Sequence, residues 1–143
     1  MPSHELHDKI SVVLLVIIIP ALLYFKIDLI TIAIFSISFW FGSRFLSPDL
    51  DLDSRIYKRW KLARFIWCPY RDLFKHRGCS HNILLGPISL IGYFGALVLL
   101  IVYIASGTIL EYHEGFLVVV AGMVLAIETH IITDKLMSKK KKK

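Results

Sequence analysis

Residues 10–46 read ISVVLLVIIIPALLYFKIDLITIAIFSISFWFGSRFL, and this long apolar run decides the fold. Three charged residues interrupt it: Lys26, Asp28 and Arg44. A helix rises 1.5 Å per residue and about 20 residues cross the hydrocarbon core of a bilayer, so the run is too long for one membrane helix. It predicts a hairpin of two membrane helices, at about 10–25 and 29–46, with the turn at Lys26 to Asp28.

Two further apolar runs, at about 83–105 and 115–133, complete a set of four predicted spans. The chain has 143 residues, of which 56% are hydrophobic, and its mean hydropathy is +0.64, more apolar than a soluble domain of this size. We therefore expect an all-α membrane protein with four transmembrane helices. A single membrane domain covers residues 1–138, and a lysine tail follows at 139–143.

Charge sets the expected orientation. The formal net charge is +6, and the basic residues lie in the long loop, residues 47–82, beside the spans and in the tail, with only Lys26 on the opposite side. By the positive-inside rule, both termini and the long loop are cytoplasmic in a multi-pass protein of the cell membrane. Because flanking charge explains the basic balance, the lipid bilayer is the expected partner and nucleic acid is not.

The beginning of the chain and the cysteines exclude two other interpretations. The chain starts with acidic and histidine residues instead of a basic segment, and no small-residue cleavage pattern follows the first apolar run, so we expect the first helix to stay in the mature protein. Cys68 and Cys79 lack the spacing of a zinc knot or a disulfide framework.

The long loop begins with Ser47-Pro48-Asp49, which is typical of a turn or a helix start because proline fits the first helical position. Further along, residues 54–67 carry aromatic residues at helical spacing among several basic ones. This pattern predicts one amphipathic helix on the membrane surface, ended by Pro69.

Histidines and aspartates gather where the predicted spans end on the cytoplasmic side. Span ends in this topology bring together seven candidate metal ligands: His7, Asp49, Asp51, His76, His81, His130 and Asp134. His130 and Asp134 stand four apart, so a helix would point both side chains the same way. Mixed imidazole nitrogens and carboxylate oxygens suit zinc, manganese or iron(II), and seven ligands are enough for one or two ions.

Each element of this cluster also has a purely structural interpretation. The N-terminal histidines suit an exposed helix turn, the aspartates suit a helix N-terminus, and His76 with His81 suits a surface loop turning at Gly78. Glu128 is deep enough to need a partner, either the metal site or an arginine such as Arg44. Whether His4, Asp53, Cys79 and Glu128 take part stays open.

The motifs Ser47-Pro48-Asp49-Leu50-Asp51, Trp67-x-Pro69-Tyr70 and His76-Arg77-Gly78-x-Ser80-His81 resemble an uncharacterised family of metal-binding membrane proteins. More distantly, the chain is similar to YdjM-type inner-membrane metal-dependent hydrolases, which share a Pro-Asp-x-Asp turn and a later His-x-x-x-Asp. The resemblance implies a helical membrane fold and metal ligation by the matching positions. Cys79 and Asp53 lie outside the shared pattern.

The leading functional hypothesis is a metal-dependent hydrolase that acts on a phosphoryl or acyl ester, of a lipid or another anionic substrate near the membrane. Asp49 or Asp51 would bridge the ions, which makes Asp51 a catalytic candidate, and Arg77 would bind the anionic group. The alternatives are a metal-binding structural or transport protein and a basic membrane-surface adaptor. The sequence does not determine the substrate, the metal or the oligomeric state.

Overall fold

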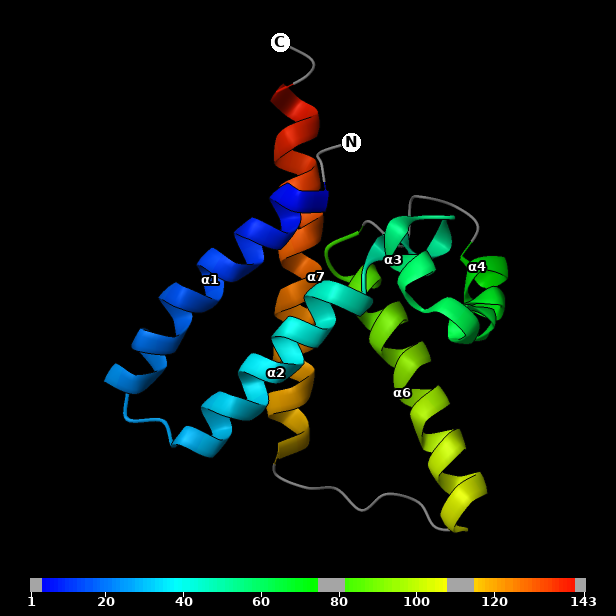
Figure 1. Cartoon of the computed structure of the whole chain (residues 1–143), viewed down its shortest axis with the longest axis horizontal. Helices are drawn as coiled ribbons and strands as arrows, with labels where there is room; N and C mark the ends of the chain where they lie inside the picture. Colours follow the sequence, from blue (N-terminus) through cyan, green and yellow to red (C-terminus); the bar gives the residue numbers. More distant parts are fainter. Residues whose placement is uncertain (1–3, 75–81, 108–114, 141–143) are drawn as a thin grey trace.

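The computed structural model describes residues 4–74, 82–107 and 115–140, and within these ranges it contains helices and no strands. Four long helices dominate (Figure 1): α1 (His4–Tyr24), α2 (Leu29–Phe45), α6 (Leu85–Ser106) and α7 (Gly115–Lys140). Shorter helices lie between α2 and α6: η1 (Pro48–Asp51), α3 (Arg55–Arg59), η2 (Lys61–Trp67) and α4 (Cys68–Leu73). Four of the described helical segments are long and apolar enough to cross a membrane, which confirms the predicted all-α architecture.

The predicted turn of the first hairpin is confirmed. α1 ends at Tyr24, Lys26 adopts a left-handed backbone conformation with φ of 56°, and Asp28 caps the start of α2 by accepting a 2.9 Å hydrogen bond from the Thr31 amide. Hydrogen bonds from Thr31 hold the pKa of Asp28 below its ordinary value. The first and last helices extend beyond the predicted spans: α1 already begins at His4, and α7 continues to Lys140.

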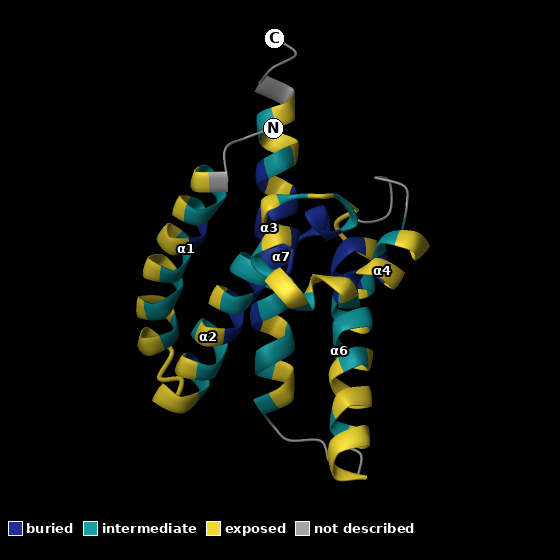
Figure 2. Ribbon diagram, turned by 45° about the vertical axis from the view of Figure 1, so that its right-hand side comes forward, coloured by how far each residue is buried: buried dark blue, intermediate teal, exposed yellow. Residues whose placement is uncertain are grey.

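The tightest packing in the bundle joins α2 to α7, which lie side by side in Figures 1 and 2. A Cβ atom added at Gly122 would lie 2.8 Å from the backbone oxygen of Phe35, and one added at Gly42 would lie 2.9 Å from the Cβ of Ala126. In lipid no hydrophobic force drives helices together, so their association depends on close packing. Small residues permit this packing because they let the backbones approach.

The segment predicted as one amphipathic surface helix, residues 54–67, is instead broken into α3 and η2, so that prediction is wrong. The backbone of Lys61 has φ of 46°, which a right-handed helix does not tolerate, and α3 therefore stops at Arg59. Pro69 does not end a helix either, because it lies in the first turn of α4.

The physical reason for this break is the burial of aromatic side chains. Trp67 and Tyr70 are fully buried, and the Nε1 of Trp60 donates a 3.0 Å hydrogen bond to the Phe45 carbonyl at the end of α2. One straight helix on a flat surface could not bury rings on several sides. The short helices instead fold over the ends of α2, α6 and α7, where they share a core with Leu46, Leu50, Leu90, Ile127 and Ile131 (Figure 2).

We predict that Gly122→Leu destabilises the bundle, since its side chain would meet backbone atoms of α2 that cannot move aside cheaply. Overpacking of this kind costs about 1–3 kcal/mol or more. The measurement is thermal unfolding of the protein in detergent, followed by circular dichroism. Gly95→Leu is the matched control, because nothing lies within 4 Å of a Cβ at Gly95 on α6. Equal melting temperatures for the two variants would contradict the close packing.

Candidate metal centre

Three separate parts of the chain meet at the end of the bundle where the N- and C-terminal helix ends lie (Figure 1). They are the first turns of α1, the η1 turn that follows α2, and the second half of α7. Each contributes polar side chains to one cluster, which contains His7, Asp49, His130 and Asp134.

Helix α7 supplies two members of the cluster. His130 and Asp134 are one helical turn apart, and the Nε2 of His130 lies 3.4 Å from the Oδ2 of Asp134. The imidazole is buried, with 8% of its side chain exposed, and the carboxylate is 22% exposed. The predicted i, i+4 pair is therefore formed at the edge of the buried core.

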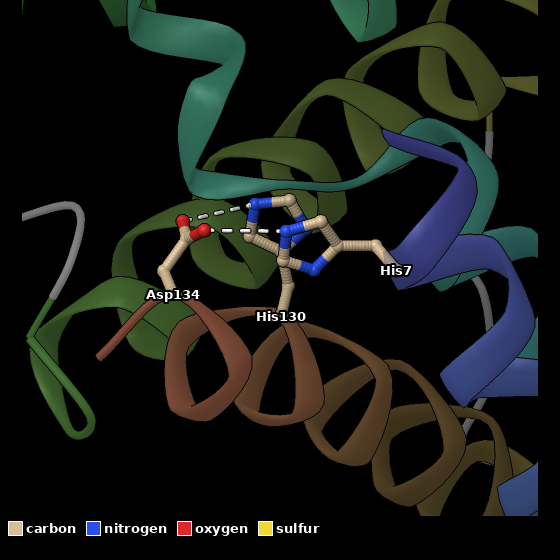
Figure 3. A group of neighbouring side chains, drawn as sticks. All are labelled: His7, His130 and Asp134. Carbon is tan, nitrogen blue, oxygen red and sulfur yellow. Dashed lines mark ion pairs between the residues drawn. The ribbon is translucent and has the colours of Figure 1, made fainter. Parts of the chain in front are cut away.

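Helix α1 adds the second imidazole. The Nε2 of His7 lies 3.2 Å from the Oδ1 of Asp134, and its ring stacks on that of His130 with centroids 4.1 Å apart and planes 16° apart. The two rings thus direct one nitrogen each at the two oxygens of a single carboxylate (Figure 3).

The η1 turn adds Asp49 and Ser47 from the other side. The Oδ2 of Asp49 lies 3.4 Å from the Nε2 of His130, and the hydroxyl of Ser47 lies 3.2 Å from the same nitrogen. The side chain of Ser47 also caps η1 by accepting a hydrogen bond from the Asp49 amide, which fixes the direction of the turn. One imidazole nitrogen therefore faces two carboxylates and a hydroxyl.

This arrangement is difficult to satisfy with protons alone. A nitrogen carries at most one proton, so the Nε2 of His130 cannot form good hydrogen bonds to both carboxylates at once. Nor is the group a serine-hydrolase triad, because Ser47 and the acids meet the same nitrogen, whereas in a triad the acid orients the imidazole through its other nitrogen. A cation among the donor atoms would satisfy all of them together.

The distances also fit a metal ion. Donor atoms bound tetrahedrally at about 2.0–2.1 Å lie about 3.3 Å from one another, whereas charge-assisted hydrogen bonds are usually about 2.7–2.9 Å long. The separations between the Nε2 of His130 or His7 and their neighbours are 3.2–3.4 Å. Ligand atoms of His7, His130 and Asp134 all lie within 4.8 Å of one another.

A neighbouring ion-pair network fixes the position of α1. The carboxylate of Asp8 lies 3.6 Å from the guanidinium of Arg44 and 3.5 Å from that of Arg59, while Arg59 also donates to the backbone oxygen of Arg44 at 3.1 Å. These contacts tie the start of α1 to the end of α2 and to α3. Since Asp8 follows His7 directly, the network holds the imidazole over the end of α7.

The candidate residues named from the sequence divide into three groups. The structure brings His7, Asp49, His130 and Asp134 together, and it places Asp51 in the same η1 turn. His76, Arg77, Cys79 and His81 lie outside the described residues. Asp53 pairs at the surface with Lys58 at 3.3 Å, and Glu128 lines an apolar groove, while Arg44 contacts Asp8 instead of Glu128.

Sequence reasoning missed two residues of the site, Ser47 and Asp8. Ser47 was noted only as part of a turn motif, because a serine before proline and aspartate is a common helix cap. The signal for Asp8 was its place directly after His7, in a chain with basic residues at the end of the next span. Neither signal determines which atoms meet in three dimensions.

Comparison with known proteins bears directly on this cluster. Residues 2–112 match the family described as "Uncharacterized metal-binding protein (DUF2227)". The chain belongs to this family. The expected metal-binding family is thereby confirmed. The match includes His7 and Asp49, and the structure adds His130 and Asp134 of α7, which lie beyond it.

Other comparisons place limits on what can be transferred to this DUF2227 member. An "Uncharacterized protein" from Aquifex aeolicus (strain VF5) is 44% identical over 55 residues, which cover 38% of this chain and 39% of that protein. No solved structure matches the chain. The similarity to YdjM-type hydrolases is found in none of these comparisons and stays a hypothesis.

We predict that Ser47→Ala weakens the affinity for Zn²⁺ or Mn²⁺ about 10–100-fold, because its hydroxyl caps the turn that positions Asp49 and the loss of a group that orients a metal ligand has effects of this size. Competition with a chelating dye measures the affinity. Ser43→Ala is the matched control, because its hydroxyl bonds only to the Trp40 carbonyl on its own helix. If both variants bind metal as tightly as the unchanged protein, Ser47 has no part in positioning Asp49.

Proposed function

We propose that this protein binds a divalent transition-metal ion at the cytoplasmic face of a cell membrane, through His7, Asp49, His130 and Asp134. One observation carries the proposal: two carboxylates and a hydroxyl lie 3.2–3.4 Å from the buried Nε2 of His130, and the Nε2 of His7 lies 3.2 Å from one of these carboxylates, that of Asp134. Membership of a metal-binding family supports it. The cytoplasmic placement rests on the distribution of lysine and arginine.

Charge favours a dication in this position. With neutral imidazoles the cluster carries the two negative charges of Asp49 and Asp134, and both carboxylates are largely removed from water. Bringing two carboxylates together in a site of low polarity is unfavourable unless a cation compensates them. Two nitrogens and two carboxylate oxygens suit zinc, manganese or iron(II) better than calcium.

The remaining sequence candidates enlarge the proposed site. Asp51 follows Asp49 in the same turn, and His76 and His81 belong to the same loop of the chain. Together they bring enough nitrogen and oxygen donors for a second ion. A second ion would share a carboxylate with the first, as in many sites that hold two metals.

A hydrolytic role is the first functional candidate for the bound metal. A carboxylate-rich, mixed nitrogen and oxygen donor set is typical of metal centres that activate water and polarise a phosphoryl or acyl oxygen. In this proposal the residues of the chain have distinct roles: Asp49 or Asp51 would be the bridging carboxylate, and Arg77 would bind the negative charge of a membrane ester.

A structural role is the second candidate, and another feature favours it. Four protein side chains already supply donors to the cluster, and structural zinc sites are typically closed by four protein ligands, whereas catalytic sites keep a position open. An ion held in this way would join α1, η1 and α7 and close the end of the bundle.

For metal binding, we predict that the purified protein contains about one ion or more per chain and that Asp134→Asn and His130→Ala lose most of it. Elemental analysis of the detergent-purified protein gives the metal content directly. Asp53→Asn provides the control, because its carboxylate is 65% exposed and contacts Lys58 at the surface. Equal metal content in all four proteins would refute the site.

For hydrolysis, we predict that the metal-loaded protein cleaves at least one member of a panel of phospholipids and phosphodiesters, and that Asp51→Asn lowers the rate about 100-fold or more, because it removes a carboxylate of the proposed site. Product release is followed by mass spectrometry with added Zn²⁺ or Mn²⁺. A fully loaded protein that is inactive on the whole panel would favour the structural role. In that case metal removal should lower the melting temperature.

A further inference from the structure

A groove of about 280 Å³ lies between α6 and α7, apart from the metal centre. Its lining is apolar with one exception, the carboxylate of Glu128. The apolar walls come from both helices: Pro87, Ile88 and Ile91 belong to α6, Leu84 precedes it, and Val120 and Val124 belong to α7. Both helices are among those long and apolar enough to span a membrane.

The groove and the metal centre face different sides of α7. Glu128 precedes His130 by two residues, which turns the two side chains by about 200° around the helix axis. Val120, Val124 and Glu128 follow one another at intervals of four and so form one stripe that faces α6. Glu128 in the groove and His130 in the metal centre therefore lie at almost the same level along the axis of α7, but on different sides of the helix.

The carboxylate of Glu128 has no hydrogen bond or ion pair with any residue in the described ranges 4–74, 82–107 and 115–140. The arginine expected to pair with it, Arg44, contacts Asp8 instead. An acidic group within a membrane segment is costly, faces a partner or a cavity in most proteins, and marks a functional site by default. Within those ranges its oxygens are therefore available to a ligand bound in the groove.

The groove is polar at one end and apolar along the rest of its length. Helices α6 and α7 run in opposite directions (Figure 1), so Glu128 lies near the start of α6, beside Ile83 and Leu84. Val120 and Gly92 line the other end. A molecule that matches this lining has a hydrogen-bond-donating, positively charged head and an apolar chain.

We propose that the groove between α6 and α7 binds a phospholipid with a primary ammonium headgroup, whose nitrogen contacts Glu128 and whose acyl chain lies along Val124 and Ile91. A primary ammonium supplies both the positive charge and the three donors that a carboxylate accepts. A choline headgroup carries the same charge but has no N–H to donate. Discrimination between these two lipids is thus the direct consequence of the proposed contact.

The test offers the detergent-purified protein equal amounts of phosphatidylethanolamine and phosphatidylcholine with identical acyl chains, and counts retained lipid by native mass spectrometry. We expect about a tenfold preference for phosphatidylethanolamine, which corresponds to one charge-assisted hydrogen bond. Glu128→Gln should abolish the preference, whereas Asp53→Asn, which removes an exposed carboxylate, should keep it.

A second pair of variants tests the groove without altering the acid. Nothing lies within 4 Å of a Cβ at Gly92 or at Gly95, so a larger side chain fits at either position without strain. Gly92 lines the groove, and Gly95 is not among the lining residues. Gly92→Leu should therefore reduce the retention of both lipids, while Gly95→Leu should retain them as the unchanged protein does.

Three results would overturn the proposal. The first is equal retention of the two lipids by the unchanged protein, and the second is an unaltered preference in Glu128→Gln. The third is a lipid-free dimer that Glu128→Gln dissociates, because the groove would then be an interface between two copies of the chain. Metal content separates this inference from the proposed metal centre, because Glu128→Gln removes no proposed ligand and should leave the bound metal unchanged.

Discussion

The close approach of α2 and α7 is the constraint on which the rest of the structure depends. Glycines at the contact, Gly42 and Gly122, leave no room for a side chain, so the two helix backbones touch along the middle of the bundle. Because α2 ends beside α7, the η1 turn begins next to His130, and Asp49 reaches the imidazole without a long connecting loop. A wider spacing would separate these two donors, whatever their order in the sequence.

The second constraint is electrostatic. Carboxylates from η1 and α7 share one buried imidazole nitrogen, and an ion-pair network around Asp8 fixes the helix that brings His7. In an apolar bundle such a group is stable only when every charge is balanced at short range. Burial of these carboxylates is energetically unfavourable, yet their geometry is well defined. Both properties are usual in a metal centre.

Much of this could be predicted from the sequence, because apolar length determines a membrane helix and span ends determine which polar residues share a layer. His7, Asp49, His130 and Asp134 were found in this way, and the structure brings them together. The break at Lys61 could not be predicted, since it depends on aromatic rings that are buried from several directions at once. Local patterns also cannot show which hydroxyl or carboxylate will meet a given nitrogen.

The position of His7 on the first helix and of His130 on the last has a consequence for biosynthesis. In the proposed membrane topology, α1 would enter the bilayer well before α7 had been translated, so the donors on the two helices could not meet until every span was in place. Capture of an ion by both ends is therefore possible only for a chain that has completed its insertion with the intended topology. The centre would distinguish finished molecules from truncated or inverted ones.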